Sequence, residues 1–260
     1  MAFLMNAWYA AAWSHEIRDK PFRRVLLNQP VVLFRKQNGE ALAFTNICPH
    51  RFAPLHLGTV VNDAIECPYH GLRFNSEGVC VFNPDGDGRV PPGERLQRFP
   101  LLERYGTLWI WLGIDAADES KLPDFGFLTD PEHYKPVVGL IEVNADYRFV
   151  LDNLRTLASH FLTPETESRT HYFWSICRNF RLDDEEFDRQ IRAGTEYAFV
   201  EQDEKMLRAI QEQVGGTDFW SRRPMLLHAD QGPVRVRRAL ESLIAAESEP
   251  QRAATELTTA

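Results

Sequence analysis

The chain has 260 residues, of which 44% are hydrophobic, enough to bury a core in one large or two smaller domains. Its 29 Lys and Arg against 37 Asp and Glu give a formal net charge of -8, and the basic residues are scattered, which disfavours a nucleic-acid partner. No apolar run approaches the roughly 20 residues that span a bilayer, and residues 1–13 lack the positive leading region of a signal peptide, so we predict a cytoplasmic protein with no membrane partner.

The sequence of the first part of the chain, up to about residue 114, predicts short strands. β-Branched and aromatic runs fill residues 22–47, where turns at Gln29-Pro30 and Asn38-Gly39 separate them. Similar runs predict further strands over residues 72–74, 79–82, 96–103 and 107–112. This pattern predicts a small all-β domain over residues 1–114.

Two short segments in this β region carry a candidate cofactor site. Cys48-Pro-His50 is followed, after 16 intervening residues, by Cys67-Pro-Tyr-His70, so each segment offers one thiolate and one imidazole. When two Cys bind one iron and two His bind the other, the centre is a Rieske [2Fe-2S] cluster, whose imidazoles raise the reduction potential. We therefore predict that Cys48, His50, Cys67 and His70 hold such a cluster and that the chain transfers single electrons.

A structural zinc ion is the alternative, because two thiolates and two imidazoles also suit tetrahedral Zn²⁺. The spacing argues against zinc. Zinc fingers usually take a Cys pair from one knuckle and a His pair from a helix, whereas both segments here are mixed. His56, six residues after His50, is interpreted as a surface or packing residue.

Residues 115–136, rich in Pro, Gly and Asp, are predicted to form a connector. Beyond it the pattern is mixed, which predicts a second, α+β domain over residues 137–248. Its expected elements are strands at 137–143 and 171–180 and a helix at 146–157. Residues 249–260 are predicted to be a disordered tail.

A long helix is predicted after Leu182, where acidic residues favour an N-terminus, and it is expected to end at Gly215-Gly216. Asp203 lies on this helix at helical spacing with the apolar residues Phe199 and Ile210. From periodicity alone, a helix boundary or a nearby Arg explains such an acid better than a role as metal ligand does.

Several runs together resemble one known family. They are Cys48 to Gly58, Cys67 to Phe74, Asn83-Pro84, Leu162 to Glu167, His171 to Phe173 and Arg178 to Phe180. The set resembles the oxygenase component of Rieske non-heme iron oxygenases of the vanillate O-demethylase and dicamba monooxygenase type. The resemblance covers nearly the whole chain.

This resemblance implies a homotrimer with an all-β Rieske domain followed by a helix-grip-type α+β catalytic domain. A reductase or ferredoxin would supply electrons to the [2Fe-2S] cluster, which would pass them to a mononuclear Fe(II) in a neighbouring subunit. Two His and one carboxylate hold that iron in the family, and Asp203 matches the carboxylate. The implied reaction is an O₂-dependent monooxygenation of a small aromatic compound, usually an O-demethylation.

The chain departs from the family pattern where the mononuclear iron should bind. After Asn153 the family has a bridging Asp and two His, whereas this chain has Thr156, Ser159 and Pro164 at the corresponding places. We interpret this as an internal deletion near Leu154, which truncates the catalytic domain and would leave its sheet without its middle strands.

Two functions from different classes follow. The resemblance favours an oxygenase component in aromatic catabolism, in which His160 matches a family His near the substrate pocket. The missing iron ligands favour a catalytically inactive electron-transfer remnant. An iron site rebuilt from His160, His171 and Asp203 is a third interpretation, which no helical spacing supports. The sequence assigns no catalytic residue.

Overall fold

The chain folds as two compact units. The computed structural model describes residues 3–85, 87–90, 95–153, 158–216, 220, 224 and 230–258. The N-terminal unit comprises Trp8–Leu112, and the C-terminal unit comprises Met1–Ala7 together with Gly113–Ala260. Strands dominate the first unit and both helices and strands build the second, which confirms the predicted fold class.

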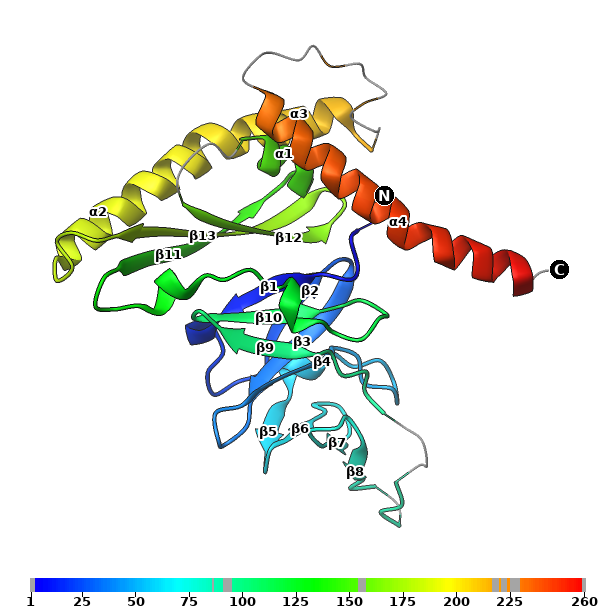
Figure 1. The fold of residues 1–260 in the computed structure, drawn as a ribbon. Coiled ribbons are helices and arrows are strands. Elements are labelled where there is room, and N and C mark those ends of the chain that lie inside the picture. Colours follow the sequence, from blue (N-terminus) through cyan, green and yellow to red (C-terminus); the bar gives the residue numbers. More distant parts are fainter. Residues whose placement is uncertain are drawn as a thin grey trace. The chain divides into compact units, whose positions relative to one another are not determined.

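Three antiparallel sheets make up the described part of the N-terminal unit (Figure 1). The first has the order β1 (Trp8–Trp13), β10 (Thr107–Trp111), β9 (Leu101–Arg104). The second has the order β2 (Phe22–Leu26), β3 (Gln29–Arg35), β4 (Ala41–Thr45). The third has the order β5 (Thr59–Val61), β6 (Ala64–Glu66), β7 (Arg73–Phe74), β8 (Cys80–Phe82). Short 3₁₀ turns, η1 (Ser14–Glu16) and η2 (Leu55–Leu57), lie between strands.

One apolar core joins the second and third sheets and contains the two ligand thiols. Phe34, Phe44 and Phe74 are fully buried in it, and the rings of Phe34 and Phe44 stack with centroids 5.9 Å apart. Cys48 and Cys67 belong to the same buried cluster. Burial of one large apolar side chain stabilises the folded state by about 1.5–3 kcal/mol, so this core stabilises the position of the two segments that begin at Cys48 and Cys67.

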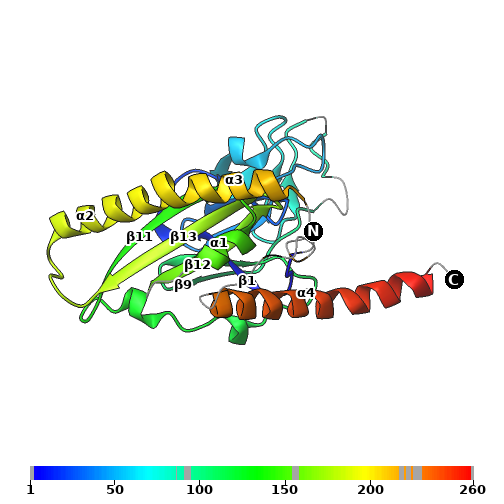
Figure 2. The ribbon, with the colours of Figure 1, turned by 90° about the horizontal axis from the view of Figure 1, so that it is seen from above.

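A three-stranded antiparallel sheet forms the centre of the C-terminal unit, in the order β11 (Lys135–Val143), β13 (Arg169–Arg178), β12 (Ser159–Thr166). Figure 2 shows a long helical rod passing over one face of this sheet. The rod consists of α2 (Glu185–Glu196), the π-helical η5 (Tyr197–Asp203) and α3 (Glu204–Val214). The remaining elements are η3 (Glu119–Lys121), η4 (Gly126–Thr129), α1 (Tyr147–Asn153) and α4 (Gln231–Thr258).

The sheet of the C-terminal unit is continuous, because β13 pairs with β11 on one side and β12 on the other. The expected gap left by missing middle strands is therefore not seen among the described strands, and β11 and β12 form the edges instead. Close packing fixes the β11–β13 pair. Gly139 of β11 lies so near the Trp174 indole that a Cβ there would be 2.4 Å from the ring.

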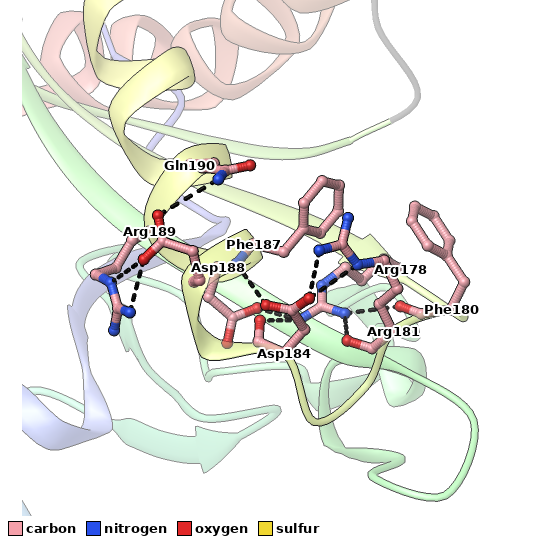
Figure 3. Close-up of polar contacts among 9 residues, drawn as sticks. Arg178, Phe180, Arg181, Asp184, Phe187, Asp188, Arg189 and Gln190 are labelled. Atoms are coloured by element: carbon pink, nitrogen blue, oxygen red, sulfur yellow. Dashed lines mark hydrogen bonds and ion pairs between the residues drawn. The ribbon is translucent and has the colours of Figure 1, made fainter.

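The turn between β13 and α2 depends on a buried arginine (Figure 3). The Arg178 guanidinium donates to the backbone carbonyls of Phe180, Arg181 and Asp184 and to the Asp188 carboxylate. The Asp184 carboxylate accepts the Phe187 N–H at 2.9 Å and caps α2. This confirms the predicted acidic N-terminus of the long helix.

The far end of the long helical rod also agrees with the sequence. Gly215 follows α3 with a φ of 61°, where a residue without Cβ is favoured. Helix α4 extends to Thr258, which differs from the predicted disordered tail over 249–260. Ala and Glu, which favour helix, are frequent in that segment. No helix in the described part of the chain is long and apolar enough to cross a bilayer.

Candidate metal centre

The first ligand loop, residues 48–53, is a compact turn closed by two backbone hydrogen bonds. The Cys48 N–H donates to the Ala53 carbonyl at 2.9 Å, and the Phe52 N–H donates to the Cys48 carbonyl at 2.9 Å. Phe52 has a left-handed backbone with φ 57°. His50 therefore lies between Cys48 and Phe52, whose backbones are joined by a hydrogen bond.

The second ligand loop, residues 67–72, repeats this geometry. The Cys67 N–H donates to the Leu72 carbonyl at 2.8 Å, and the Gly71 N–H donates to the Cys67 carbonyl at 3.1 Å. Gly71 has φ 70° and therefore takes the place that Phe52 has in the first loop. The two ligand loops thus have the same backbone hydrogen bonds, and each carries its Cys at the first position of the turn. We refer to them as twin loops.

The four predicted ligand side chains form two pairs. The Cys48 and Cys67 thiols are close enough to hydrogen bond, and burial is the main reason why the pKa of Cys48 rises to about 11, with a further contribution from Cys67. The imidazole rings of His50 and His70 lie with centroids 4.6 Å apart. The structure thus brings together a thiol pair and an imidazole pair.

This division into pairs suits a two-iron cluster and not one tetrahedral ion. A zinc site needs its ligands around a single point. No three His, Cys, Asp or Glu side chains in the described residues converge in that way. A cavity of about 420 Å³, lined by His50, His70 and the buried Cys80, provides space beside the imidazole pair. Cys48 and Cys67 would hold one iron of a [2Fe-2S] cluster, and His50 and His70 the other.

His56 has a structural partner and does not join the four ligands. Its Nδ1 lies 2.9 Å from Asn46 Nδ2, and its backbone N–H donates to Asn46 Oδ1 at 2.8 Å. Burial lowers the pKa of His56, which favours the neutral ring. The interpretation of His56 as a packing residue agrees with this pair.

Asp203 lies at a second cluster of polar side chains, in the C-terminal unit. It ends the π-helical η5, a type of segment that often marks functional sites. Burial, and to a lesser extent the Asp203 carboxylate, raises the pKa of Tyr172 on β13. The Tyr172 hydroxyl lies 2.7 Å from Nδ1 of His160 on β12. Sequence reasoning missed Tyr172 because nothing in the local pattern distinguishes it from a core aromatic residue.

His171 cannot join His160 and Asp203. Successive side chains of a strand point to opposite faces of the sheet, and the neighbouring Tyr172 packs on Phe199 of the helical rod, with ring centroids 4.3 Å apart. His171 therefore faces the other side, where its Nε2 lies 3.7 Å from Glu165 Oε2. The rebuilt site from His160, His171 and Asp203 is not formed.

The remaining positions of the family's iron site offer no further ligand in the described residues. Ser159 and Pro164 lie on β12, and neither side chain is a usual iron ligand. Thr156 lies outside the described residues. The described donor set at Asp203 thus does not fit a three-ligand mononuclear iron.

Comparisons with known proteins cover both units. Residues 7–100 match the model of the Rieske [2Fe-2S] domain, and residues 142–246 match the model of the vanillate O-demethylase oxygenase C-terminal domain. The chain is 35% identical to the oxygenase component of chloroacetanilide N-alkylformylase from Rhizorhabdus wittichii, over 96% of this chain and 98% of the relative. It is 31% identical to the oxygenase component of dicamba O-demethylase from Stenotrophomonas maltophilia, over 94% and 98%.

The fold is similar to solved structures of the same type. Dicamba monooxygenase bound to dicamba superposes with a TM-score of 0.90 at 31% identity, over 96% of this chain and 100% of that one. The alignment with the chloroacetanilide enzyme spans 341 positions, more than the 260 residues of this chain. Part of that relative therefore has no counterpart here, in agreement with an internal deletion.

Proposed function

We propose that this chain, which belongs to the Rieske-type oxygenase components of the vanillate O-demethylase family, accepts electrons one at a time at Cys48, His50, Cys67 and His70 for the O₂-dependent monooxygenation of a small aromatic compound. The single observation that carries the proposal is the pair of twin loops, which present two thiols and two imidazoles. A bound Rieske cluster supplies one-electron redox chemistry at a higher potential than an all-thiolate cluster.

The residues of this chain contribute binding and orientation to that step. The buried thiols lie in the apolar core, while His50 is exposed and His70 half-buried. An electron partner therefore reaches the imidazole side of the centre. The relatives are named oxygenase components, which implies a separate reductase or ferredoxin as the donor. A homotrimer and a cytoplasmic location remain part of the proposal.

The substrate class rests on the relatives and on the polar cluster at Asp203. Two relatives are named for O-demethylation of dicamba and of vanillate, both small aromatic acids. In this chain the half-buried His160, whose pKa burial lowers, and Tyr172 offer neutral hydrogen-bonding groups on the sheet face under the helical rod. We propose a methoxylated or related small aromatic acid as the substrate.

The relatives favour the oxygenase, and the second function, electron transfer without oxygen chemistry, rests on the described donors at Asp203 alone. Among the described residues, His160 contacts Tyr172, whose pKa the Asp203 carboxylate helps to raise, whereas His171 lies on the opposite face of the sheet. Such a chain would accept an electron and pass it to an external protein.

One assay tests both functions. The anaerobically purified chain is mixed with a ferredoxin, its reductase and NADH, and then with O₂ and vanillate or dicamba. Bleaching of the cluster absorption followed by formaldehyde release supports the oxygenase. Bleaching that reverses without formaldehyde supports electron transfer only. A chain that shows no cluster absorption contradicts both.

A further inference from the structure

An ion pair closes the second ligand loop at its base. Glu66 is the last residue of β6 and Arg73 is the first of β7, and the two lie opposite each other in the antiparallel register. The loop of residues 67–72 is the connection between them. Arg73 Nε donates to Glu66 Oε2 at 2.6 Å, so the pair spans the two ends of the loop that carries Cys67 and His70.

Arg73 is also held from a third strand. Its guanidinium carbon lies 4.5 Å from the centroid of the Phe82 ring on β8, which is the geometry of a cation–π contact. The side chains of Arg73 and Glu66 are 31% and 28% exposed, so water screens their charges only in part. The contact with Phe82 therefore fixes the position of the pair. Because screening by water is incomplete, the charges of Glu66 and Arg73 act electrostatically on nearby groups.

The positions of the first ligand loop that correspond to Glu66 and Arg73 hold the uncharged residues Ile47 and Pro54. Farther from the loop, the Asn46 amide binds His56. Since the two loops are twins in their backbone, the charged pair distinguishes the second loop from the first.

We propose that the Glu66–Arg73 pair positions the loop that carries Cys67 and His70 and balances the charge beside the cluster, so that loss of either partner alone shifts the reduction potential. The proposal rests on the [2Fe-2S] centre proposed above. Reduction adds one negative charge to the cluster, so a nearby cation favours it and a nearby anion opposes it. In the pair these two effects largely cancel, and removing one partner leaves the other charge uncompensated.

The test measures the cluster potential in the full-length chain for Glu66→Gln, Arg73→Gln and the double variant. Arg73→Gln leaves Glu66 alone and is expected to lower the equilibrium constant of reduction about threefold, or ~28 mV for one electron. Glu66→Gln is expected to raise it by about the same factor. The double variant is expected to return close to the unmodified chain.

A matched ion pair provides the control. Arg98 and Glu77 lie 2.9 Å apart in the same unit but outside both ligand loops. Glu77→Gln and Arg98→Gln change the charge equally and are expected to leave the potential within error. If the reduction potential depends only on the net charge of the chain, the control variants will shift it as much as Glu66→Gln and Arg73→Gln do. That result would overturn the proposal.

The single variants separate an electrostatic role from a merely structural one. Opposite shifts support the proposal, whereas equal potentials, or shifts in the same direction, overturn it. If Arg73→Gln loses the cluster, Arg73→Lys keeps the charge and is expected to restore both the cluster and its potential. A cluster lost in Arg73→Lys as well overturns the electrostatic role. Absence of iron and sulfide from the unmodified chain would instead contradict the proposed centre itself.

Discussion

Phe52 and Gly71 occupy equivalent places in the twin ligand loops. Each donates its N–H to the carbonyl of its loop's Cys, and each has a left-handed backbone, with φ 57° and 70°. A phenylalanine in this conformation is strained by roughly 1–2 kcal/mol relative to glycine. Phe52 is 77% exposed, so core packing does not explain a phenylalanine at that place.

Gly71→Ala is predicted to weaken cluster retention. The added Cβ would lie 3.1 Å from Pro84 Cγ, and the left-handed φ would add about 1–2 kcal/mol of strain. Gly39→Ala is the control, because Gly39 also has a left-handed φ but no atom within 4 Å of the new Cβ. The measurement is the urea midpoint for loss of cluster absorption. Equal midpoints in the two variants would show that the Pro84 contact has no effect.

Gly139→Ala is predicted to destabilise the C-terminal unit by about 1–3 kcal/mol, because its Cβ would overlap the Trp174 ring. Gly194→Ala, at an open position of α2, is predicted to stabilise by up to about 1 kcal/mol through helix propensity. Denaturant unfolding followed by near-UV circular dichroism measures both. A Gly139→Ala variant as stable as the unmodified chain would contradict the close β11–Trp174 packing.

Tyr147→Phe is predicted to protect the C-terminal unit at alkaline pH. Burial raises the pKa of the Tyr147 hydroxyl to about 12 from 10.0. Because the folded-state pKa is raised, this group's contribution to stability is complete below pH 10 and is lost as the pH rises through 12. The hydroxyl is buried without a hydrogen-bond partner among the described residues, so its removal costs little. Thermal unfolding at pH 8 and pH 11 measures the difference, and an equal loss of stability in both proteins would contradict the prediction.

Asp203→Ala is predicted to leave the cluster unchanged, since Asp203 belongs to the C-terminal unit and all four cluster ligands belong to the N-terminal unit. Iron, sulfide and visible absorption per chain should equal those of the unmodified protein. Loss of iron beyond that of the cluster would reveal a mononuclear site that uses Asp203.

The cluster loops could be predicted from sequence because their information is local. Cys48 and His50, like Cys67 and His70, are neighbours in the chain, and the twin turns follow from the residues between them. The contact between Tyr172 and His160 could not be predicted, because it depends on the register of β12 against β13. Pairing of strands is a tertiary property, and Pro164 disfavours a strand in the local pattern.

The Asp203 region shows the same limit. Helical spacing predicted an apolar stripe with Phe199 and Ile210, yet the π-helical segment shifts the phase, so that Phe199 is buried and Ile210 is 37% exposed. Sequence periodicity assumes 3.6 residues per turn, and a π segment breaks that assumption.

The most direct test is the number of iron and acid-labile sulfide ions per chain after anaerobic purification. Cys48, His50, Cys67 and His70 together predict two of each for the cluster, and the proposed oxygen chemistry requires one further iron that a mild chelator removes. Fewer than two irons or no sulfide would contradict the Rieske centre. Two irons, with none lost on chelation, would contradict the oxygenase and leave electron transfer as the function.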